Sequence, residues 1–224
     1  MEIIIYGIGW ILATLISLIL ITRLTKMYGY VTIVALFSGL YVISSILANK
    51  IIILFGFNVP AGTILFSITF LLTDMLSEFF VKEKARQAVW LGLISQIFLV
   101  LSLWVVIEWP YPDYWQNQEA FETSLSSTWR IVIGSFVAFL ISQNHDIWAF
   151  HLWKKKFGNK HLWFRNNAST VVSQFLDSVA FTYIAFWGML PVWPIILGTF
   201  GVKVIIAIID TPFLYLSRYI YNKE

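Results

Sequence analysis

Long apolar runs alternate with short polar segments along the whole chain. Seven of these runs have about the ~20 residues that a helix needs to cross the hydrocarbon of a bilayer. They cover residues 3–22, 30–51, 62–80, 88–107, 130–147, 170–190 and 193–217. The pattern therefore predicts an all-α integral membrane protein, a bundle of about seven transmembrane helices.

Composition agrees with this fold class. Hydrophobic residues make up 59% of the chain and charged residues 12%, with a mean hydropathy of +0.78. This is too little polar surface to cover a soluble globule of 224 residues. The net charge of +3 is too small to indicate nucleic acid binding, and the absence of cysteine excludes disulfides and thiol chemistry.

The first apolar run is expected to be a retained helix. Its only flanking charge is Glu2, so the basic start of a secretory signal peptide is missing. No A-x-A cleavage pattern followed by a soluble domain is found after it. We therefore count this run as the first membrane span.

Basic residues set the expected orientation. Twelve of the fifteen Lys and Arg fall on one side of a seven-span bundle: Arg23, Lys26, Lys82, Lys84, Arg86, Lys154, Lys155, Lys156, Lys160, Arg165, Arg218 and Lys223. The loop after the fourth span instead holds acidic residues. By the positive-inside rule the N-terminus lies outside and the C-terminus is cytoplasmic.

Three of the apolar runs carry charged side chains inside them, away from the loops at their ends: Asp74, Glu78, Asp177, Lys203 and Asp210. A charge within hydrocarbon costs several kcal/mol unless it lines a cavity or finds a partner. These residues are therefore the first candidates for a functional site.

The third apolar run places its polar residues on one helical face. Ser67, Asp74 and Glu78 fall within one sector, because seven residues turn a helix through about 700° and four through about 400°. Glu78 could also lie at the membrane surface and pair with Lys82, at i,i+4 spacing. Asp74 lies one turn deeper and needs another explanation.

The sixth and seventh runs add further polar groups. Gln174 and Asp177 have the i,i+3 spacing of neighbours, and both need partners inside a membrane. Lys203 lies near the midplane, with Asp210 seven residues later on nearly the same face. Lys203 could neutralise Asp177 or Asp210 in a pair that bridges two helices, or bind a ligand, or do both.

A metal site is not expected. His145, Asp146 and His151 lie near the end of the fifth run, but a separation of six residues does not place the two histidines on one helical face. We interpret these residues as polar groups at the cytoplasmic mouth of the span.

Several short runs resemble one known family. They are Ala48 to Ile52, Asn58 to Phe66, Thr73 to Glu78, Lys84 to Arg86, Gln143 to Trp153, Arg165 to Thr170, Gln174 to Asp177, Lys203 and Asp210 to Pro212. Together they are similar to the vitamin uptake transporter family of queuosine precursor transporters. The resemblance covers roughly residues 38–216 and is more specific than any one run alone.

The resemblance implies import of 7-deazaguanine bases, such as 7-cyano-7-deazaguanine, across the plasma (inner) membrane of a prokaryote. It also implies a six-helix core. That core would occupy residues 30–224, and residues 1–29 would form an additional N-terminal helix of unassigned role.

The polar residues suit a guanine-like ligand. Its edge presents two N–H donors and one carbonyl acceptor, which a carboxylate and an amide or ammonium can bind. The acceptor candidates are Asp74, Glu78 and Asp177, the donor candidates are Asn49, Asn167, Gln174 and Lys203, and Asp210 completes the expected substrate-binding set. Phe66, Phe70 and Phe181 could stack on a flat ring, but a Phe in a membrane helix usually packs or faces lipid.

Other functions stay open at this point. They include a substrate-binding membrane subunit for another vitamin-like solute, a membrane-embedded enzyme with Asp74 and Asp177 as a carboxylate pair, and an assembly protein whose charges only join helices. No cofactor is expected, and no phosphate-binding glycine loop is present. The expected partners are a nucleobase-like small molecule and membrane lipid, with a homo-oligomer and an energising partner protein left open.

Overall fold

The computed structural model describes residues 2–126, 128–158, 162–188 and 191–222. Within these ranges, the side chains of residues 2–6, 126, 128, 162, 163 and 165–167 lie outside the description.

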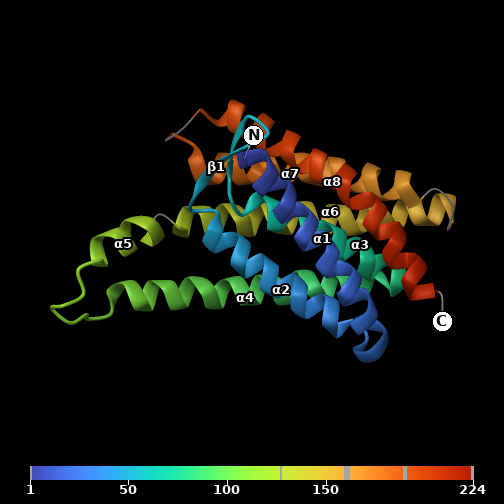
Figure 1. Cartoon of the computed structure of the whole chain (residues 1–224), viewed down its shortest axis with the longest axis horizontal. Coiled ribbons are helices and arrows are strands. Elements are labelled where there is room, and N and C mark those ends of the chain that lie inside the picture. Colours follow the sequence, from blue (N-terminus) through green and yellow to red (C-terminus); the bar gives the residue numbers. More distant parts are fainter. Residues whose placement is uncertain (1, 127, 159–161, 189–190, 223–224) are drawn as a thin grey trace.

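Seven long helices, one short helix and a small hairpin make up the described part of the chain. Most of the long helices run roughly along the long axis of the molecule (Figure 1). In order, the elements are α1 (Glu2–Tyr28), α2 (Val31–Leu47), β1 (Ile51–Leu54), β2 (Phe57–Pro60), α3 (Thr63–Phe79), α4 (Lys82–Glu108), α5 (Gln118–Ser126), α6 (Thr128–Phe157), α7 (Leu162–Phe186) and α8 (Val192–Asn222). The expected all-α membrane architecture is confirmed.

In the described part of the chain, four stretches are long and apolar enough by themselves to cross a membrane: Gly7–Tyr28, Lys82–Glu108, Gln118–Phe157 and Val192–Asn222. The third comprises α5 and α6, with residue 127 between them outside the description. Helices α2 and α3 have 17 residues each. Helix α3 packs against α8, α2, α4 and α6, and its residues from Thr63 to Ser77 are buried apart from Phe66. A helix enclosed by other helices needs no continuous apolar surface, because protein rather than lipid surrounds it.

Helix α1 is docked onto the bundle along one stripe. Ile11, Leu15, Leu18, Thr22 and Thr25 are all buried, at alternating spacings of four and three residues. This spacing keeps side chains on one helical face. The stripe packs against α8 and α2, while residues such as Ile16 and Leu20 stay exposed as expected for lipid contact. The division into an N-terminal addition and a six-helix core stays a prediction.

The connection between α2 and α3 is a β-hairpin. The predicted second span ran to residue 51, but α2 ends at Leu47 and β1 begins at Ile51, so this boundary was wrong. The two strands pair antiparallel through a turn in which Phe55 and Gly56 have φ of 53° and 84°. Two positive φ values are the pattern of a type I′ turn, which suits a two-residue hairpin loop. Strand β2 then leads directly into α3.

Helix α6 continues well beyond the predicted fifth span. The span was expected to end at residue 147, whereas the helix reaches Phe157. Asp146 therefore lies about eleven residues, or ~16 Å, inside the end of the helix. The interpretation of Asp146 as a group at the helix mouth was wrong, because its side chain is fully buried.

The two ends of the bundle differ in character. The hairpin lies at one end, and α5 with the loop before it extends beyond the bundle in that direction (Figure 1). The C-terminus lies at the other end, where α8 stops (Figure 1). Most of the predicted cytoplasmic basic residues belong to connections at this second end, because they lie near the junctions α1–α2, α3–α4 and α6–α7.

The close packing of α3 against α2 can be tested at Gly62. A Cβ placed on Gly62 would overlap the backbone oxygen of Ser44, so α3 and α2 could not keep their separation. We expect Gly62→Ala to cost about 1–3 kcal/mol of stability, measured as a lower unfolding temperature in detergent. Gly39→Ala is the control, because nothing lies within 4 Å of its Cβ. Equal unfolding temperatures for the two variants would contradict this packing.

Candidate functional site

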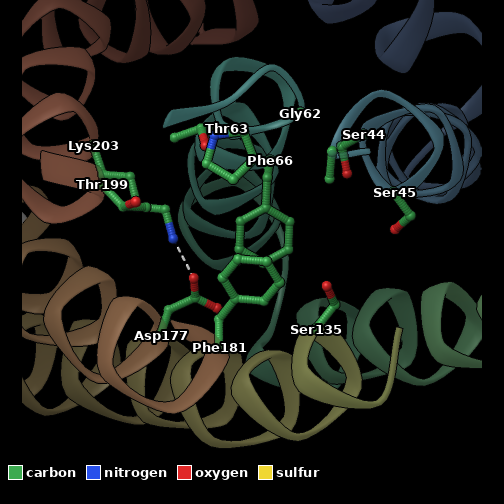
Figure 2. Close-up of a pocket in the computed structure, with 12 residues that line it drawn as sticks. Ser44, Ser45, Gly62, Thr63, Phe66, Ser135, Asp177, Phe181, Thr199 and Lys203 are labelled. Atoms are coloured by element: carbon green, nitrogen blue, oxygen red, sulfur yellow. Dashed lines mark hydrogen bonds and ion pairs between the residues drawn. The ribbon is translucent and has the colours of Figure 1, made fainter. Parts of the chain in front are cut away.

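A cavity between five helices, with about 400 Å³ of space between atoms that is partly open to solvent, lies in the half of the bundle near the hairpin. The lining residues come from α2, β2, α3, α6, α7 and α8 and the loops joining them (Figure 2). They are Ser44, Ser45, Ala48, Pro60, Gly62, Thr63, Phe66, Ser135, Asp177, Phe181, Thr199 and Lys203.

One buried ion pair crosses this cavity. Lys203 Nζ on α8 donates to Asp177 Oδ2 on α7, and both side chains are 3% exposed (Figure 2). The other carboxylate oxygen, Oδ1, accepts a hydrogen bond of 3.2 Å from Ser142 on α6. A buried pair of this kind compensates each charge for lost hydration, and removing either partner leaves a costly lone charge. Asp177 and Lys203 are thus polar anchors of the cavity and also join three helices.

Aromatic rings form part of the cavity wall. Phe66 and Phe181 point into it (Figure 2). The Lys203 ammonium lies 5.1 Å from the centre of the Phe66 ring, within cation–π range. Phe66 is supported from behind by Tyr41 and Phe139, at centroid distances of 5.7 and 5.9 Å. The cavity therefore combines flat apolar surfaces with one opposed pair of charges.

Hydroxyl groups complete the lining. Ser44 Oγ and Ser45 Oγ donate to the backbone oxygen of Tyr41, at 2.8 and 3.2 Å. Thr199 Oγ1 is buried beside Lys203, with no hydrogen-bond partner among the described residues (Figure 2). A buried hydroxyl without a partner costs free energy, so Thr199 is a ready contact for a polar ligand atom.

A second polar group lies deeper, toward the C-terminal end of the bundle. Asp74 on α3, Asp146 on α6 and Asp210 on α8 are 1%, 0% and 2% exposed. Asp146 acts electrostatically on both Asp74 and Asp210. Thr170 on α7 donates to Asp74 Oδ2 at 3.3 Å. We call Asp74, Asp146 and Asp210 the acid cluster.

Polar side chains connect the cavity with the acid cluster. Gln143 on α6 contacts Thr69 and Thr73 on α3, each at 3.2 Å. Its neighbour Ser142 contacts Asp177 in the cavity, and Asp146 follows one turn later. Hydrogen-bonding groups therefore continue from the cavity to the acid cluster through an otherwise apolar interior.

A third polar group closes the C-terminal end. Glu78 on α3 forms ion pairs of 3.4 Å with Lys154 on α6 and with Arg218 on α8. Lys154 Nζ also donates to the backbone oxygen of Ser77 at 2.9 Å. These partners lie on other helices, in contrast to the sequence-local pairing with Lys82 that was considered for Glu78.

The expected substrate-binding residues thus fall into separate places. Asp177 and Lys203 line the cavity together. Asp74 and Asp210 belong to the acid cluster, and Glu78 to the closing group. Gln174 is fully buried without a hydrogen-bond partner among the described residues. Asn49 donates a hydrogen bond of 3.0 Å to the backbone oxygen of Ile46. The side chain of Asn167 lies outside the described residues.

Sequence reasoning missed some of the structure's polar interior. Asp146 was set aside because the predicted span ended one residue after it. A signal existed, since Ser142, Gln143 and Asp146 lie on neighbouring turns of α6. Phe66 and Phe181 were named but left out, because the sequence does not show which Phe residues face a cavity.

The fold and the site define a class. A helical membrane bundle that encloses a cavity with charged, aromatic and hydroxyl groups has the features of a carrier for a small polar solute. The family model described as "Putative vitamin uptake transporter" matches residues 60–217. The chain belongs to this family of membrane transporters.

Two curated relatives agree with the family assignment. The chain is 30% identical over 213 residues to the "Probable queuosine precursor transporter" of Bacillus subtilis (strain 168), covering 93% of both chains. It is 27% identical over 164 residues to the "Queuosine precursor transporter" of Escherichia coli (strain K12), covering 73% of this chain and 72% of the relative. No solved structure matches the chain.

The protein is accordingly a transporter and not an enzyme. The geometry agrees, because Asp74 and Asp177 do not form a carboxylate dyad. Asp177 pairs with Lys203, whereas Asp74 lies with Asp146.

The Asp177–Lys203 pair yields a stability test. Lys203→Met leaves the Asp177 carboxylate buried without its cation, so we expect a loss of about 3–5 kcal/mol. The double variant Asp177→Asn with Lys203→Met removes both charges and should recover much of that loss. Thermal unfolding in detergent measures both effects, with exposed Lys82→Met as the control. A double variant no more stable than Lys203→Met would contradict the pairing.

Proposed function

We propose that this protein imports a queuosine precursor, a 7-deazaguanine base such as 7-cyano-7-deazaguanine, into the cytoplasm. The names of the two relatives support this substrate class. The cavity near the hairpin is the proposed binding site. The sequence predicted eight substrate-binding residues, and the proposed site keeps a smaller set around Asp177 and Lys203.

The Asp177–Lys203 pair is the observation that carries the proposal. A guanine-like edge has N–H donors at N1 and N2 beside a carbonyl acceptor at O6. Asp177 would accept from the two N–H groups, and Lys203 would donate to the carbonyl oxygen. The pair supports this assignment because an acceptor and a donor lie side by side in the cavity lining.

The rest of the cavity suits a flat bicyclic ring. Phe66 and Phe181 offer aromatic faces on which such a ring can stack. Thr199, whose hydroxyl has no partner among the described residues, offers one more polar contact. A ligand held in this way exchanges hydration for hydrogen bonds and stacking, which is how a polar base can be accepted in a membrane interior.

The positions of the basic residues support one orientation of the bundle in the membrane. With the basic junctions in the cytoplasm, the N-terminus and the hairpin end lie outside. The cavity then lies in the outer half, and the Glu78 group lies between the acid cluster and the cytoplasm. The base would enter from the hairpin end and leave past the Glu78 group.

Direct binding tests the substrate class. We expect 7-cyano-7-deazaguanine to bind the purified protein saturably, measured by calorimetry and by a rise in unfolding temperature in detergent. Adenine should fail to compete, because it presents an acceptor at N1 and a donor at position 6, the reverse of what Asp177 and Lys203 require. Folded protein that binds adenine equally well, or that binds only an unrelated vitamin, would contradict the proposal.

Asp177→Asn tests the site. The amide keeps the shape but loses the charge and one acceptor, so uptake should fall by about tenfold or more. The measurement is uptake of labelled base by cells, normalised to folded protein from size-exclusion chromatography. Asp113→Asn, an exposed acid before α5, is the matched control. Normal uptake by well-expressed Asp177→Asn would remove this residue from the site.

A further inference from the structure

The acid cluster lies apart from the proposed substrate site. Asp210 follows Lys203 by seven residues of α8, and Asp74 follows Phe66 by eight residues of α3. At 1.5 Å per residue these steps place the cluster roughly 10–12 Å deeper in the bundle. None of its three residues lines the cavity. Transport of a neutral base does not require them, so they need a role of their own.

The cluster has no cationic partner among the described side chains. Among the described residues, no lysine or arginine forms an ion pair with Asp74, Asp146 or Asp210. Asp146 acts electrostatically on both Asp74 and Asp210, and ionised carboxylates buried this near to each other repel and lack hydration. Such a group holds a cation or shares protons. No described group of acids and histidines has the geometry of a metal site, and protons are therefore the better fit.

A buried amide gives a second, independent indication. Gln174 on α7 is fully buried, and neither of its side-chain atoms has a hydrogen-bond partner among the described residues. It lies one turn from Thr170, which bonds to Asp74, and one turn from Asp177 in the cavity. An unpartnered amide between the cavity and the acid cluster can hydrogen-bond a water or a ligand there, since both its ends are available.

The surrounding titratable groups belong to neighbouring sites. Among those on the surrounding helices are Glu78 on α3, His145, His151 and Lys154 on α6, Asp177 on α7, Lys203 and Arg218 on α8, Tyr41 on α2, Arg23 and Lys26 on α1, and Lys82, Glu83 and Lys84 on α4. Lys203 pairs with Asp177, Lys154 and Arg218 pair with Glu78, and His145 shares a hydrogen bond of 2.8 Å with Ser173. The cluster therefore lies between two neutralised groups.

We propose that Asp74, Asp146 and Asp210 form a proton-binding site that couples uptake of the base to inward flow of protons. The inference rests on the proposed function for the identity of the transported base. A carboxylate of the cluster takes up one proton that enters from the cavity side. It releases that proton toward the cytoplasm after the Glu78 group opens. Only an O–H bond forms and breaks, so no oxidant or other reactant is needed.

Asp146→Asn is the decisive variant. Asp146 lies outside the substrate cavity and acts on both other acids of the cluster. The amide cannot carry the proton, but it keeps the size of the side chain. Asp146→Glu retains a carboxyl group, and Asp113→Asn is the exposed control. If Asp146→Asn does not fold, Asp210→Asn takes its place.

Proteoliposomes with a defined pH gradient give the measurement. We expect the unmodified protein to accumulate 7-cyano-7-deazaguanine when the outside is acidic, approaching about tenfold for each pH unit if one proton moves with one base. A pH dye inside the vesicles should report acidification when base is added. Asp146→Asn should lose accumulation and acidification while keeping base binding and exchange of labelled for unlabelled base. Asp146→Glu and Asp113→Asn should behave like the unmodified protein.

Two results would overturn the proposal. In the first, the vesicles bind and exchange the base normally, but the amount of base inside them does not respond to the pH gradient. The other is an Asp146→Asn variant that still accumulates base with the gradient. Both leave the proposed substrate intact, so the failure of coupling is distinguishable from failure of the proposed function.

A substrate-free measurement covers the case in which the base does not bind. Infrared difference spectra between acidic and alkaline buffer show the carbonyl stretch of a protonated carboxylic acid. We expect such a band in the unmodified protein, and its loss or shift in Asp146→Asn but not in Asp113→Asn. A spectrum that is unchanged by Asp146→Asn would overturn the proton site regardless of the substrate.

Discussion

The buried ion pair between Asp177 and Lys203 is the interaction on which the rest of the interior depends. Each charge would be very costly in this environment alone, and each is compensated by the other and, for Asp177, by Ser142. The pair fixes α7 against α8 and ties both to α6. It thereby holds open a polar space between helices that otherwise pack through Leu, Ile, Val and Phe. A cavity for a polar solute can persist there because its charged lining is already satisfied.

The polar groups follow an order along the bundle axis. The cavity lies near the hairpin, the acid cluster lies deeper, and the Glu78 ion pairs close the end at which α8 finishes. Each of the three groups has residues on α3 and α8 and on α6 or α7. These four helices therefore form the polar centre of the molecule. The other long helices cover them, with apolar outer faces such as Trp90, Ile94, Phe98 and Leu101 on α4. Inner helices can be polar because outer helices provide the surface toward lipid.

Much of this architecture could be predicted from the sequence. Apolar runs located the long helices, because hydrocarbon thickness sets their length, and the charged exceptions within those runs pointed to the interior. The predicted alternatives for Lys203 included the pairing with Asp177 that the structure has. What could not be predicted is which helix faces meet. Asp74 and Glu78 share a helical face, yet one meets Asp146 and the other meets Lys154 and Arg218, since the partners come from helices far apart in sequence.

The hairpin and Asp146 show two further limits. The segment after α2 carries apolar residues that suit either a helix end or a short strand, and the tight turn at Phe55 and Gly56 decides for the strand. Asp146 was misplaced because an apolar window ended before the helix did, and Lys154 to Lys156 belong to the same helix. Helix boundaries in membrane proteins extend past the hydrocarbon, where polar residues no longer oppose helix formation.

A structure of the protein with 7-cyano-7-deazaguanine bound would test the central claim most directly. The account predicts that the base lies in the cavity near the hairpin, with the Asp177 carboxylate at its N1 and N2 edge, Lys203 at its carbonyl oxygen and Phe66 or Phe181 against its ring. A base found instead among Asp74, Asp146 and Asp210, or at the Glu78 end of the bundle, would contradict it.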